Sequence, residues 1–306
     1  AMRLGVLDVG SNTIHLQVMD AHPGARPEPA TNYKVELRLT DYLNAAGEIS
    51  ATGIALLNTA ISEAVTHANE NKTDEILAFA TSALREATNG SQIISEINTK
   101  YEIDLQVLDG NDEASMTFLA VRRWLGWSAG KLLVLDIGGG SLEIASGVDE
   151  LPEATLSLPL GAARSTREFL GPDPYTLKSV KALQKHAEEV LKASIPEILR
   201  SHDANHFVGT SKTFRTLARI CAHWYGDNPK FLERKSLGTA VSKLIAMDNK
   251  ARNELPGVSA NRAQQIVAGA IVALAVMDRL DVDEVEICPW ALREGIVLRR
   301  LDWLQD

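Results

Sequence analysis

Two short segments of the chain each end an apolar strand in an aspartate and continue through a turn of small residues. Residues 5–13 read GVLDVGSNT and contain Asp8, and residues 133–141 read LVLDIGGGS and contain Asp136, an offset of 128 positions (136 against 8). Glycine and short polar residues at such a turn let backbone N–H groups approach an anion closely. A carboxylate just before the turn can hold a metal ion or a water beside that anion. The duplication therefore predicts a phosphate site built from two loops.

The same motif also has a purely structural interpretation. An Asp-x-Gly turn is an ordinary hairpin signal, and three consecutive glycines often form a loose turn. A single copy favours that interpretation, whereas two copies that each open a strand-rich segment favour phosphate binding. Neither copy continues into Gly-Lys-Ser/Thr, which excludes a Walker loop, and neither opens a helix, which excludes a dinucleotide fingerprint.

The composition is that of an ordinary globular protein with an acidic balance. The formal net charge of -9 over 306 residues argues against non-specific binding to nucleic acid or to an anionic membrane surface. We find no stretch near the roughly 20 apolar residues that span a bilayer and no secretion signal, so we expect a cytoplasmic protein. Cys221 and Cys288 lack metal-ligand spacing and are expected to be reduced core thiols.

The elements that must position the two loops alternate between strands and helices, which predicts α/β layers. A chain of 306 residues exceeds one typical core, so we expect two domains, over residues 1–126 and 127–306. The closing helix, residues 291–306, could instead pack back on the first domain. Expected elements are a strand over 34–39 after a Pro-rich turn, and helices over 53–69 (capped by Thr52), 113–124, 176–200 (bent at Pro196), 262–280 and 290–303.

Three further segments occur in order with the two loops: TSALREA over residues 81–87, GNDEA over 110–114 and LREG over 292–295. Together the five motifs resemble those of the exopolyphosphatase and guanosine pentaphosphate phosphohydrolase (Ppx/GppA) family, and the resemblance covers essentially the whole chain. It implies an α/β fold of two duplicated ribonuclease-H-like domains, of the actin and hexokinase type, flanking a cleft. The chain looks like the short two-domain form of that family.

The resemblance implies Mg²⁺-dependent hydrolysis of the terminal phosphoanhydride of inorganic polyphosphate, with release of orthophosphate. Such a reaction needs an anchored phosphate, neutralised charge and an oriented water in line with the leaving oxygen. Glu113 is the candidate general base, although a glutamate in the first turn of a helix also satisfies the helix dipole. Arg85 is the candidate for pairing with phosphate oxygens, because its planar fork can bind them through two nitrogens.

Acidic residues near the second loop are the candidate metal ligands. We expect Asp136 and Glu143 to bind Mg²⁺ directly or through water, since Mg²⁺ prefers a few carboxylates together with water and substrate oxygens. Asp8 could orient a second metal ion or a water, and Glu143 occupies the second copy's equivalent of His15. Weaker candidates for binding phosphate are Lys212, Arg164 and Arg293. The backbone amides expected to cradle phosphates belong to Gly10, Ser11, Asn12 and Thr13 and to Gly138, Gly139, Gly140 and Ser141.

Two departures from the family pattern limit what the resemblance implies. GTSKT over residues 209–213 stands where relatives often carry a second glycine pair, so Lys212 either reduces the room for a nucleotide or supplies charge for phosphate. The chain stops at Asp306 without the all-helical extension of the longer members. This leaves open the processivity and the homodimer that are assigned to that extension.

Three alternatives to an exopolyphosphatase remain open from the residues. The first is hydrolysis of guanosine pentaphosphate to guanosine tetraphosphate by the same chemistry. The second is an ATP-dependent small-molecule kinase of the same fold group, and the third is a non-catalytic sensor of polyphosphate or of a hyperphosphorylated nucleotide. We favour polyphosphate because the paired loops occur with Glu113 and the five tryptophans give no stacking pattern for bases.

Overall fold

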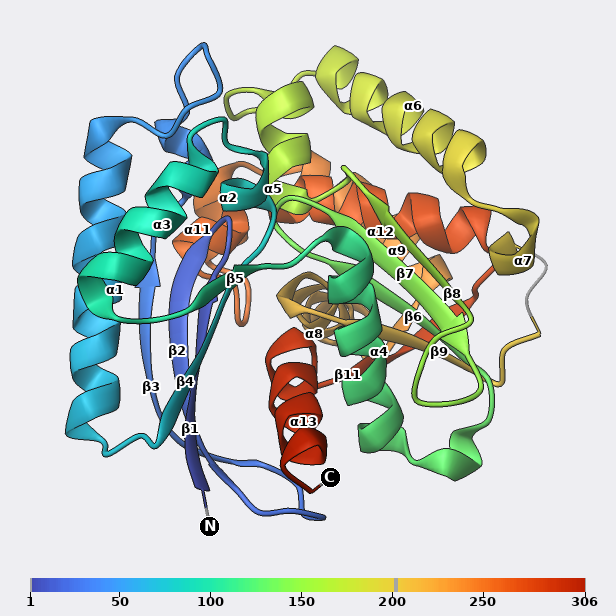
Figure 1. Cartoon of the computed structure of the whole chain (residues 1–306). Coiled ribbons are helices and arrows are strands. Elements are labelled where there is room, and N and C mark those ends of the chain that lie inside the picture. Colours follow the sequence, from blue (N-terminus) through green and yellow to red (C-terminus); the bar gives the residue numbers. More distant parts are fainter. Residues whose placement is uncertain (1, 201–202, 306) are drawn as a thin grey trace. The chain divides into compact units, whose positions relative to one another are not determined.

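The computed structural model describes residues 2–200 and 203–305, and this part of the chain divides into two compact units (Figure 1). Unit 1 extends to Met116 and resumes at Leu292, and unit 2 spans Thr117–Ala291. The boundary lies inside helix α4 (Gly110–Leu125), whereas the expected domain boundary lies just after the C-terminal end of that helix. The division into residues 1–126 and 127–306 stays a prediction.

Unit 1 is built on a five-stranded mixed sheet in the order β3-β2-β1-β4-β5. Its strands are β1 (Met2–Val9), β2 (Thr13–Ala21), β3 (Glu28–Glu36), β4 (Glu75–Ala80) and β5 (Leu105–Val107). The strands β1, β2 and β3 form an antiparallel meander, whereas β1, β4 and β5 run parallel. Successive side chains of a strand point to opposite faces, so a sheet with apolar residues on both faces needs cover on each.

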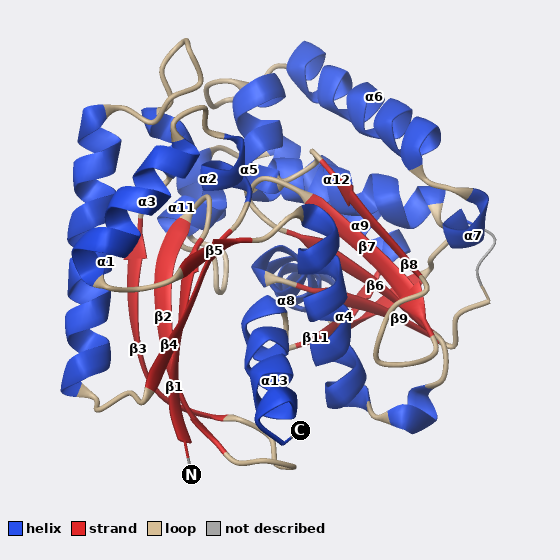
Figure 2. Ribbon diagram, viewed as in Figure 1, coloured by secondary structure: helices blue, strands red, loops and turns tan. Residues whose placement is uncertain are grey.

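Helices supply that cover in unit 1. The elements are η1 (Leu39–Tyr42), α1 (Ala51–Glu70), α2 (Ser82–Glu86), α3 (Gly90–Tyr101) and α13 (Leu292–Gln305). The side chain of Leu7 is fully buried in the core that α1 and α3 form with one face of the sheet (Figure 2). On the other face, Val6 packs with Val297 and Leu301 of α13. The C-terminal helix therefore completes the core of unit 1, although almost the whole chain separates it from β1.

Unit 2 is built on a six-stranded mixed sheet in the order β10-β11-β9-β6-β7-β8. Its strands are β6 (Leu132–Ile137), β7 (Leu142–Gly147), β8 (Ala154–Leu158), β9 (His206–Thr210), β10 (Phe231–Glu233) and β11 (Glu284–Cys288). The strands β6, β7 and β8 form an antiparallel meander, and β6, β9 and β11 run parallel. The edge strand β10 pairs antiparallel with β11.

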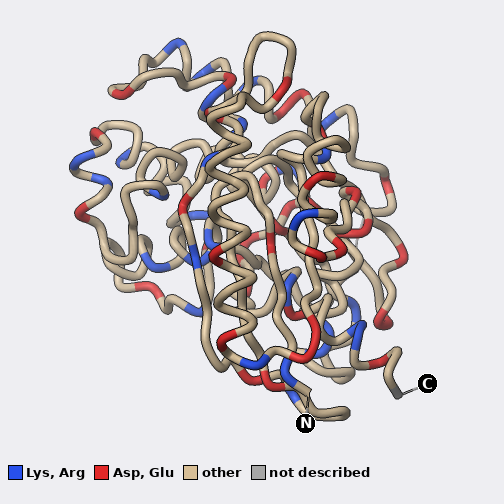
Figure 3. The backbone as a smooth tube through the Cα atoms, turned by 60° about the vertical axis from the view of Figure 1, so that its left-hand side comes forward, with Lys and Arg blue, Asp and Glu red and all other residues tan. Residues whose placement is uncertain are grey.

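The helices of unit 2 include α12, which is almost entirely buried. They are η2 (Trp127–Ala129), α5 (Ala162–Ser165) with a π-helical turn (Thr166–Leu170), α6 (Leu177–Ser194), α7 (Glu197–Arg200), α8 (Lys212–Tyr225), α9 (Arg234–Ala246), α10 (Asn249–Asn253), α11 (Ala260–Ala263) and α12 (Ile266–Arg279). Neither α12 nor any other helix within the two described ranges has the length and apolar character needed to span a bilayer. Acidic and basic residues are interspersed along both units (Figure 3).

Both cysteines lie in the core of unit 2, as predicted. Cys221 in α8 and Cys288 at the end of β11 are almost fully buried. Burial raises the pKa of the Cys221 thiol to about 12, because an apolar surrounding disfavours the thiolate. The Cys221 thiol therefore stays protonated at neutral pH and acts as a packing residue.

The duplication seen in the sequence holds in three dimensions. In β1 and β2, Asp8 is the direct register partner of His15, and in β6 and β7 the equivalent partners are Asp136 and Glu143. The turn after β1 (loop 1, residues 10–13) is closed by a bond from Gly10 N–H to the Thr13 carbonyl at 3.0 Å. The turn after β6 (loop 2, residues 138–141) is closed by a bond from Gly138 N–H to the Ser141 carbonyl at 2.9 Å. Matching strand orders and turns confirm the predicted duplicated α/β fold.

Two expectations around the first helix are wrong. The N-cap of α1 is Ser50 and not Thr52, because the Ser50 Oγ accepts a hydrogen bond from the N–H of Gly53 at 3.3 Å. The strand expected over 34–39 is β3, which begins at Glu28 and ends at Glu36. It includes Pro29, and an edge strand tolerates a proline because one side of its backbone is not paired in the sheet.

Other helices differ in their ends. The helix expected over 176–200 is two helices, α6 and α7, because Pro196 lacks the N–H that would continue the first one. The helix expected over 262–280 is also two, α11 and α12, and the Ser259 Oγ caps the first by accepting from the N–H of Arg262 at 3.2 Å. The helices α4 and α13 begin at Gly110 and Leu292 and not at 113 and 290.

Candidate active site

The strand order of unit 1 brings three separate motifs to one edge of its sheet. In the parallel ladder, Val9 of β1 is the partner of Ala80 in β4, and Ala80 is the partner of Val107 in β5. The segments that follow these three strands therefore leave the sheet side by side. They carry loop 1, the TSALREA segment and the GNDEA segment, so the fold gathers the three chemistry-bearing motifs of unit 1. Ligands of α/β sheets bind at this carboxyl edge.

Loop 1 is held from one side by backbone hydrogen bonds. Its two central carbonyls accept N–H groups from the chain just after β3. The bonds join Ser11 to Leu39 at 3.1 Å and Asn12 to Leu37 at 3.0 Å. Because a trans peptide is planar, the N–H of each following residue points away from the carbonyl before it. The N–H groups of Asn12 and Thr13 therefore point away from the supporting segment, in the direction from which an anion could bind.

The TSALREA segment supports loop 1 through a pair of serines. The hydroxyls of Ser11 and Ser82 lie 2.7 Å apart, and both side chains are buried. Ser82 opens α2, and Arg85 of the same short helix points to a different partner. One five-residue helix thus contacts loop 1 and also positions the candidate arginine. Ser82 belongs to the TSALREA motif, but nothing in the sequence alone predicts its contact with Ser11.

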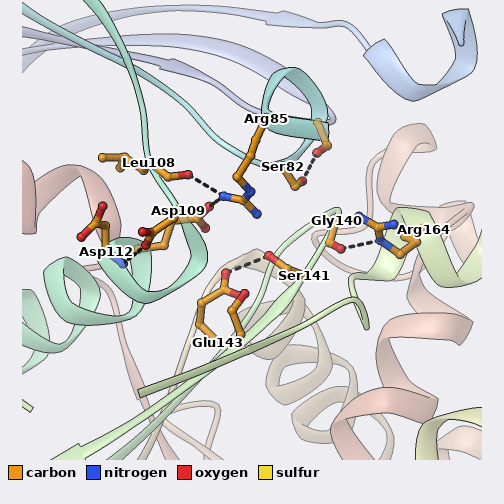
Figure 4. Close-up of polar contacts among 12 residues, drawn as sticks. Ser82, Arg85, Leu108, Asp109, Asp112, Gly140, Ser141, Glu143 and Arg164 are labelled. Carbon is orange, nitrogen blue, oxygen red and sulfur yellow. Dashed lines mark hydrogen bonds and ion pairs between the residues drawn. The ribbon is translucent and has the colours of Figure 1, made fainter. Parts of the chain in front are cut away.

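Arg85 and Glu113, which the sequence predicts as separate catalytic residues, form an ion pair. Arg85 Nη1 donates to Glu113 Oε1 at 2.8 Å and to the Leu108 carbonyl at 2.5 Å (Figure 4). Glu113 lies in the first turn of α4 and is 6% exposed. The start of α4 is fixed by Asp109, whose Oδ1 accepts from the N–H of Asp112 at 2.7 Å. The Glu113 carboxylate is therefore buried and oriented.

Asp8 lies beside a cationic side chain. Arg293 Nη1 is 3.4 Å from Asp8 Oδ2, and the two side chains are 24% and 18% exposed. Arg293 is the second residue of α13, so the LREG motif reaches Asp8 near the end of β1 through the packing of that helix on β1. A guanidinium beside Asp8 already neutralises part of its charge. The assignment of Asp8 to a second metal ion or to a water stays a prediction.

Loop 2 is held more tightly than loop 1, because its support uses three consecutive peptide groups. The carbonyls of the three glycines all accept hydrogen bonds from the first residues of α5. The donors are Ala162 N–H to Gly138 at 2.9 Å, Arg164 N–H to Gly139 at 3.0 Å and Arg164 Nε to Gly140 at 2.7 Å (Figure 4). The N–H groups of Gly139, Gly140 and Ser141 consequently point the opposite way. Successive N–H groups aimed in one direction form an anion-binding nest.

Close contact between loop 2 and α5 requires a glycine at position 161. A Cβ at Gly161 would lie 2.3 Å from the Gly139 oxygen and 2.3 Å from the Gly140 carbonyl carbon. The α5 N-terminus can therefore reach the loop only because Gly161 has no side chain. Gly161 is absent from the predicted site residues, although a glycine directly before a short helix is a signal that could have identified it.

Glu143 is buried beside loop 2 between two serine hydroxyls. It is 3% exposed. Ser141 Oγ donates to Glu143 Oε1 at 2.9 Å, and Ser157 Oγ donates to Glu143 Oε2 at 2.8 Å (Figure 4 shows the first of these). Ser157 comes from β8, where it is the direct register partner of Glu143. Sequence reasoning does not single out Ser157, because only the pairing of β7 with β8 places it there.

Comparison with known proteins agrees with this arrangement of motifs. The model of the Ppx/GppA phosphatase family matches residues 18–303. The chain belongs to that family. It is 48% identical over 305 residues to exopolyphosphatase 1 of Mycobacterium tuberculosis, covering 98% of this chain and 89% of the relative. Identity to exopolyphosphatase 1 of Mycobacterium leprae is 46%, over 98% of this chain and 90% of that protein.

Solved structures show the fold of this family member. A crystal structure of an exopolyphosphatase from Cytophaga hutchinsonii matches with a TM-score of 0.85 and 24% identity, over 99% of this chain and 98% of that one. The Aquifex aeolicus member of the Ppx/GppA family matches with a TM-score of 0.82 and 23% identity, over 100% and 99%. The predicted fold, two duplicated ribonuclease-H-like domains of the actin and hexokinase type, is confirmed.

Membership of the Ppx/GppA family suggests a metal-dependent phosphatase, and the donor set beside loop 2 fits a divalent cation. Asp136 and Glu143 are direct partners across β6 and β7, so their side chains lie on the same face of the sheet. Two like charges opposed in this way destabilise a sheet unless a cation compensates them. Mg²⁺ binds one or two carboxylates and completes its shell with water and phosphate oxygens. Within the described ranges no three His, Cys, Asp or Glu side chains gather to hold a metal ion, so water and substrate would supply the remaining ligands.

The third small-residue loop of this family member follows β9. Thr210 is the register partner of Asp136, so this loop leaves the sheet beside loop 2. Ser211 has φ of +106°, a backbone conformation that favours glycine and is strained for serine. Lys212 is the first residue of α8, a helix without a side-chain cap on its N-terminus. The structure thus places Lys212 at the same sheet edge as loop 2.

Proposed function

We propose that this chain is an exopolyphosphatase, which hydrolyses the terminal phosphoanhydride of inorganic polyphosphate and releases orthophosphate. The observation that carries the proposal is loop 2, where three consecutive carbonyls are held by α5 and the N–H groups behind them point the other way. Such a nest binds successive phosphate oxygens without reading a base or a sugar. Two relatives at 46% and 48% identity are themselves named exopolyphosphatase 1, which supports polyphosphate as the substrate.

Backbone amides hold the phosphate chain in this proposal. The amides of Gly10, Ser11, Asn12 and Thr13 in loop 1, and of Gly138, Gly139, Gly140 and Ser141 in loop 2, bind phosphate oxygens. Because both loops are supported from behind, their N–H groups need no rearrangement when the anion arrives. Lys212 adds a positive charge at the N-terminus of α8, where the helix dipole also favours an anion. These groups compensate locally for the net charge of -9.

Glu113 is the proposed general base. It accepts the proton of the attacking water, and the attack on the terminal phosphorus releases orthophosphate from the shortened chain. Arg85 holds the Glu113 carboxylate through Nη1. The remaining nitrogens of Arg85 pair with oxygens of the terminal phosphate, which places the base and the substrate on one guanidinium. A rigid pair of this kind orients the water, and orientation is a large part of catalysis in phosphoryl transfer.

Asp136 and Glu143 are the proposed ligands of Mg²⁺, with Asp8 proposed for a second cation or for a water. A bound Mg²⁺ would neutralise the charge that develops on the phosphate oxygens during hydrolysis. The side chain of Glu143 is held by Ser141 and Ser157, so this proposed ligand is preorganised for the metal ion.

Phosphate release from polyphosphate tests the proposal. With Mg²⁺ present, we expect Glu113→Gln to lose about 10²–10⁴-fold in kcat, the usual contribution of a general base. Glu96→Gln, an exposed glutamate on α3 of the same unit, is the matched control and should keep full activity. A Glu113→Gln variant with wild-type kcat would contradict the assignment of the base. A higher kcat/KM for guanosine pentaphosphate than for polyphosphate would overturn the choice of substrate.

A further inference from the structure

We infer that Ser157 is a positioning residue, which holds the Glu143 carboxylate in the orientation that binds the divalent cation. The inference rests on the proposed function, in which Glu143 is a Mg²⁺ ligand. Ser157 belongs to none of the five sequence motifs and lies 14 residues from Glu143 in the chain. It reaches Glu143 only because β8 pairs with β7 in the register that makes the two residues direct partners.

The two serines hold the carboxylate at both oxygens. Ser141 Oγ donates to Oε1 at 2.9 Å and Ser157 Oγ donates to Oε2 at 2.8 Å. A carboxylate held by one donor can still rotate about its last bond, whereas two donors on different oxygens remove that freedom. Ser141 is the last residue of loop 2, two positions before Glu143 in the chain. Ser157 is the second point of attachment, from a different strand.

The chemistry of the two donors suits a carboxylate that must still bind a cation. Each carboxylate oxygen has two lone pairs, and a serine hydroxyl occupies a single one of them. Serine brings no positive charge, whereas the Arg293 guanidinium beside Asp8 partly neutralises that carboxylate. At 3% exposure, Glu143 would be costly to bury as an ion without hydrogen-bond donors. The two hydroxyls therefore stabilise the ionised form and leave its charge available.

Binding of Mn²⁺, followed by electron paramagnetic resonance without polyphosphate, tests the inference apart from turnover. We expect Ser157→Ala to raise the Mn²⁺ dissociation constant about tenfold, because partners that orient a ligand typically contribute 10–100-fold to metal affinity. Ser157→Thr keeps the hydroxyl and should restore the affinity to within about twofold of the wild type. In the polyphosphate assay, the Mg²⁺ concentration for half-maximal rate should rise by a similar factor in Ser157→Ala, while kcat at saturating Mg²⁺ changes less.

Ser146→Ala is the matched control. Ser146 is a buried serine of β7 that lies three positions from Glu143 and therefore on the opposite face of the sheet. It should bind Mn²⁺ as the wild type does. If Ser157→Ala also binds Mn²⁺ as the wild type does, while Glu143→Gln does not, the inference is overturned and the proposed function stands. If Glu143→Gln itself keeps wild-type affinity, both the inference and the proposed metal ligand are wrong.

Discussion

Loop 1 and loop 2 have the same turn geometry, but different parts of the chain support them. Both turns are closed by the same hydrogen bond at an offset of 128 residues, from Gly10 to Thr13 and from Gly138 to Ser141 (138 against 10). In loop 1, two carbonyls accept hydrogen bonds from the N–H groups of Leu37 and Leu39, where the chain passes from β3 into η1. In loop 2, three carbonyls are held by the start of α5, and an arginine side chain supplies one of the bonds. The duplicated part is therefore the turn itself, and the supports differ between the copies.

The residue opposite the aspartate that precedes each turn also differs. Asp8 faces His15 across β1 and β2, whereas Asp136 faces Glu143 across β6 and β7. Loop 2 therefore has two carboxylates on one face, and loop 1 has one carboxylate with the Arg293 guanidinium beside it. The second copy therefore offers two carboxylates to the proposed cation, whereas in the first copy the Arg293 guanidinium lies beside the Asp8 carboxylate. One turn geometry thus occurs with two different arrangements of charge.

The largest effect should come from filling the contact between α5 and loop 2. Gly161→Ala places a Cβ 2.3 Å from two backbone atoms of the loop, so the loop must move. We expect kcat/KM for polyphosphate to fall about 10²-fold, since a displacement of about 1 Å can cost that much, and stability to fall by about 1–3 kcal/mol. Steady-state kinetics and urea unfolding measure the two effects.

Gly238→Ala is the control for that experiment. Nothing lies within 4 Å of a Cβ at Gly238 in α9, so alanine there should stabilise the helix by about 0.5–1 kcal/mol. Wild-type kinetics in Gly161→Ala would show that the support of loop 2 is not needed for its function. The different supports of the two loops would then have no effect on catalysis.

A smaller effect is expected from the arginine that only loop 2 uses. Arg164→Lys loses the Nε bond to the Gly140 carbonyl, because lysine cannot place a donor in the same direction. We expect KM for polyphosphate to rise about tenfold, with about 1 kcal/mol lost in stability. Arg167→Lys, whose guanidinium lies 3.8 Å from Glu168 at the surface, should change neither quantity. If the two variants have the same KM and the same stability, the Arg164 side chain does not contribute to the support of loop 2.

The third loop, between β9 and α8, contains a strained residue whose replacement should increase stability instead of lowering it. Ser211 has φ of +106° and ψ of 161°, and its buried Oγ has no hydrogen-bond partner among the described residues. Glycine adopts this conformation without strain, so Ser211→Gly should raise the free energy of unfolding by about 1–2 kcal/mol. An increase in the urea midpoint checks this. A decrease would mean that the Ser211 hydroxyl stabilises the loop in a way that its geometry does not show.

The smallest effect should come from the serine pair of loop 1. Single replacements Ser11→Ala and Ser82→Ala, combined in a double-mutant cycle, should show a coupling of about 1 kcal/mol, the net contribution of one buried hydrogen bond. Urea unfolding of the four proteins gives the coupling. Strictly additive losses would mean that the two hydroxyls do not interact, and the support of loop 1 would then reduce to its backbone bonds.

Local patterns predicted the two turns, the strands that flank them and the duplication, because a two-residue alternation and small residues at a turn are properties of neighbouring positions. They also predicted Glu113 at the start of a helix. They failed where a helix or strand end depends on more distant groups. The cap of α1 is one case, and β3 is another, since its length depends on pairing with β2.

The sequence by itself determined the family of this protein, its α/β class and the identity of the residues that carry charge at each loop. Only the tertiary structure decided which of them touch. Arg85 meets Glu113 because β4 and β5 are neighbours in the sheet, Arg164 meets loop 2 because Gly161 lets α5 approach, and Ser157 meets Glu143 through the register of β8. Strand order and register are set by how whole elements pack, and no spacing along the chain encodes them directly. The chemistry of the loops is therefore local in sequence, and the support that makes it rigid is not.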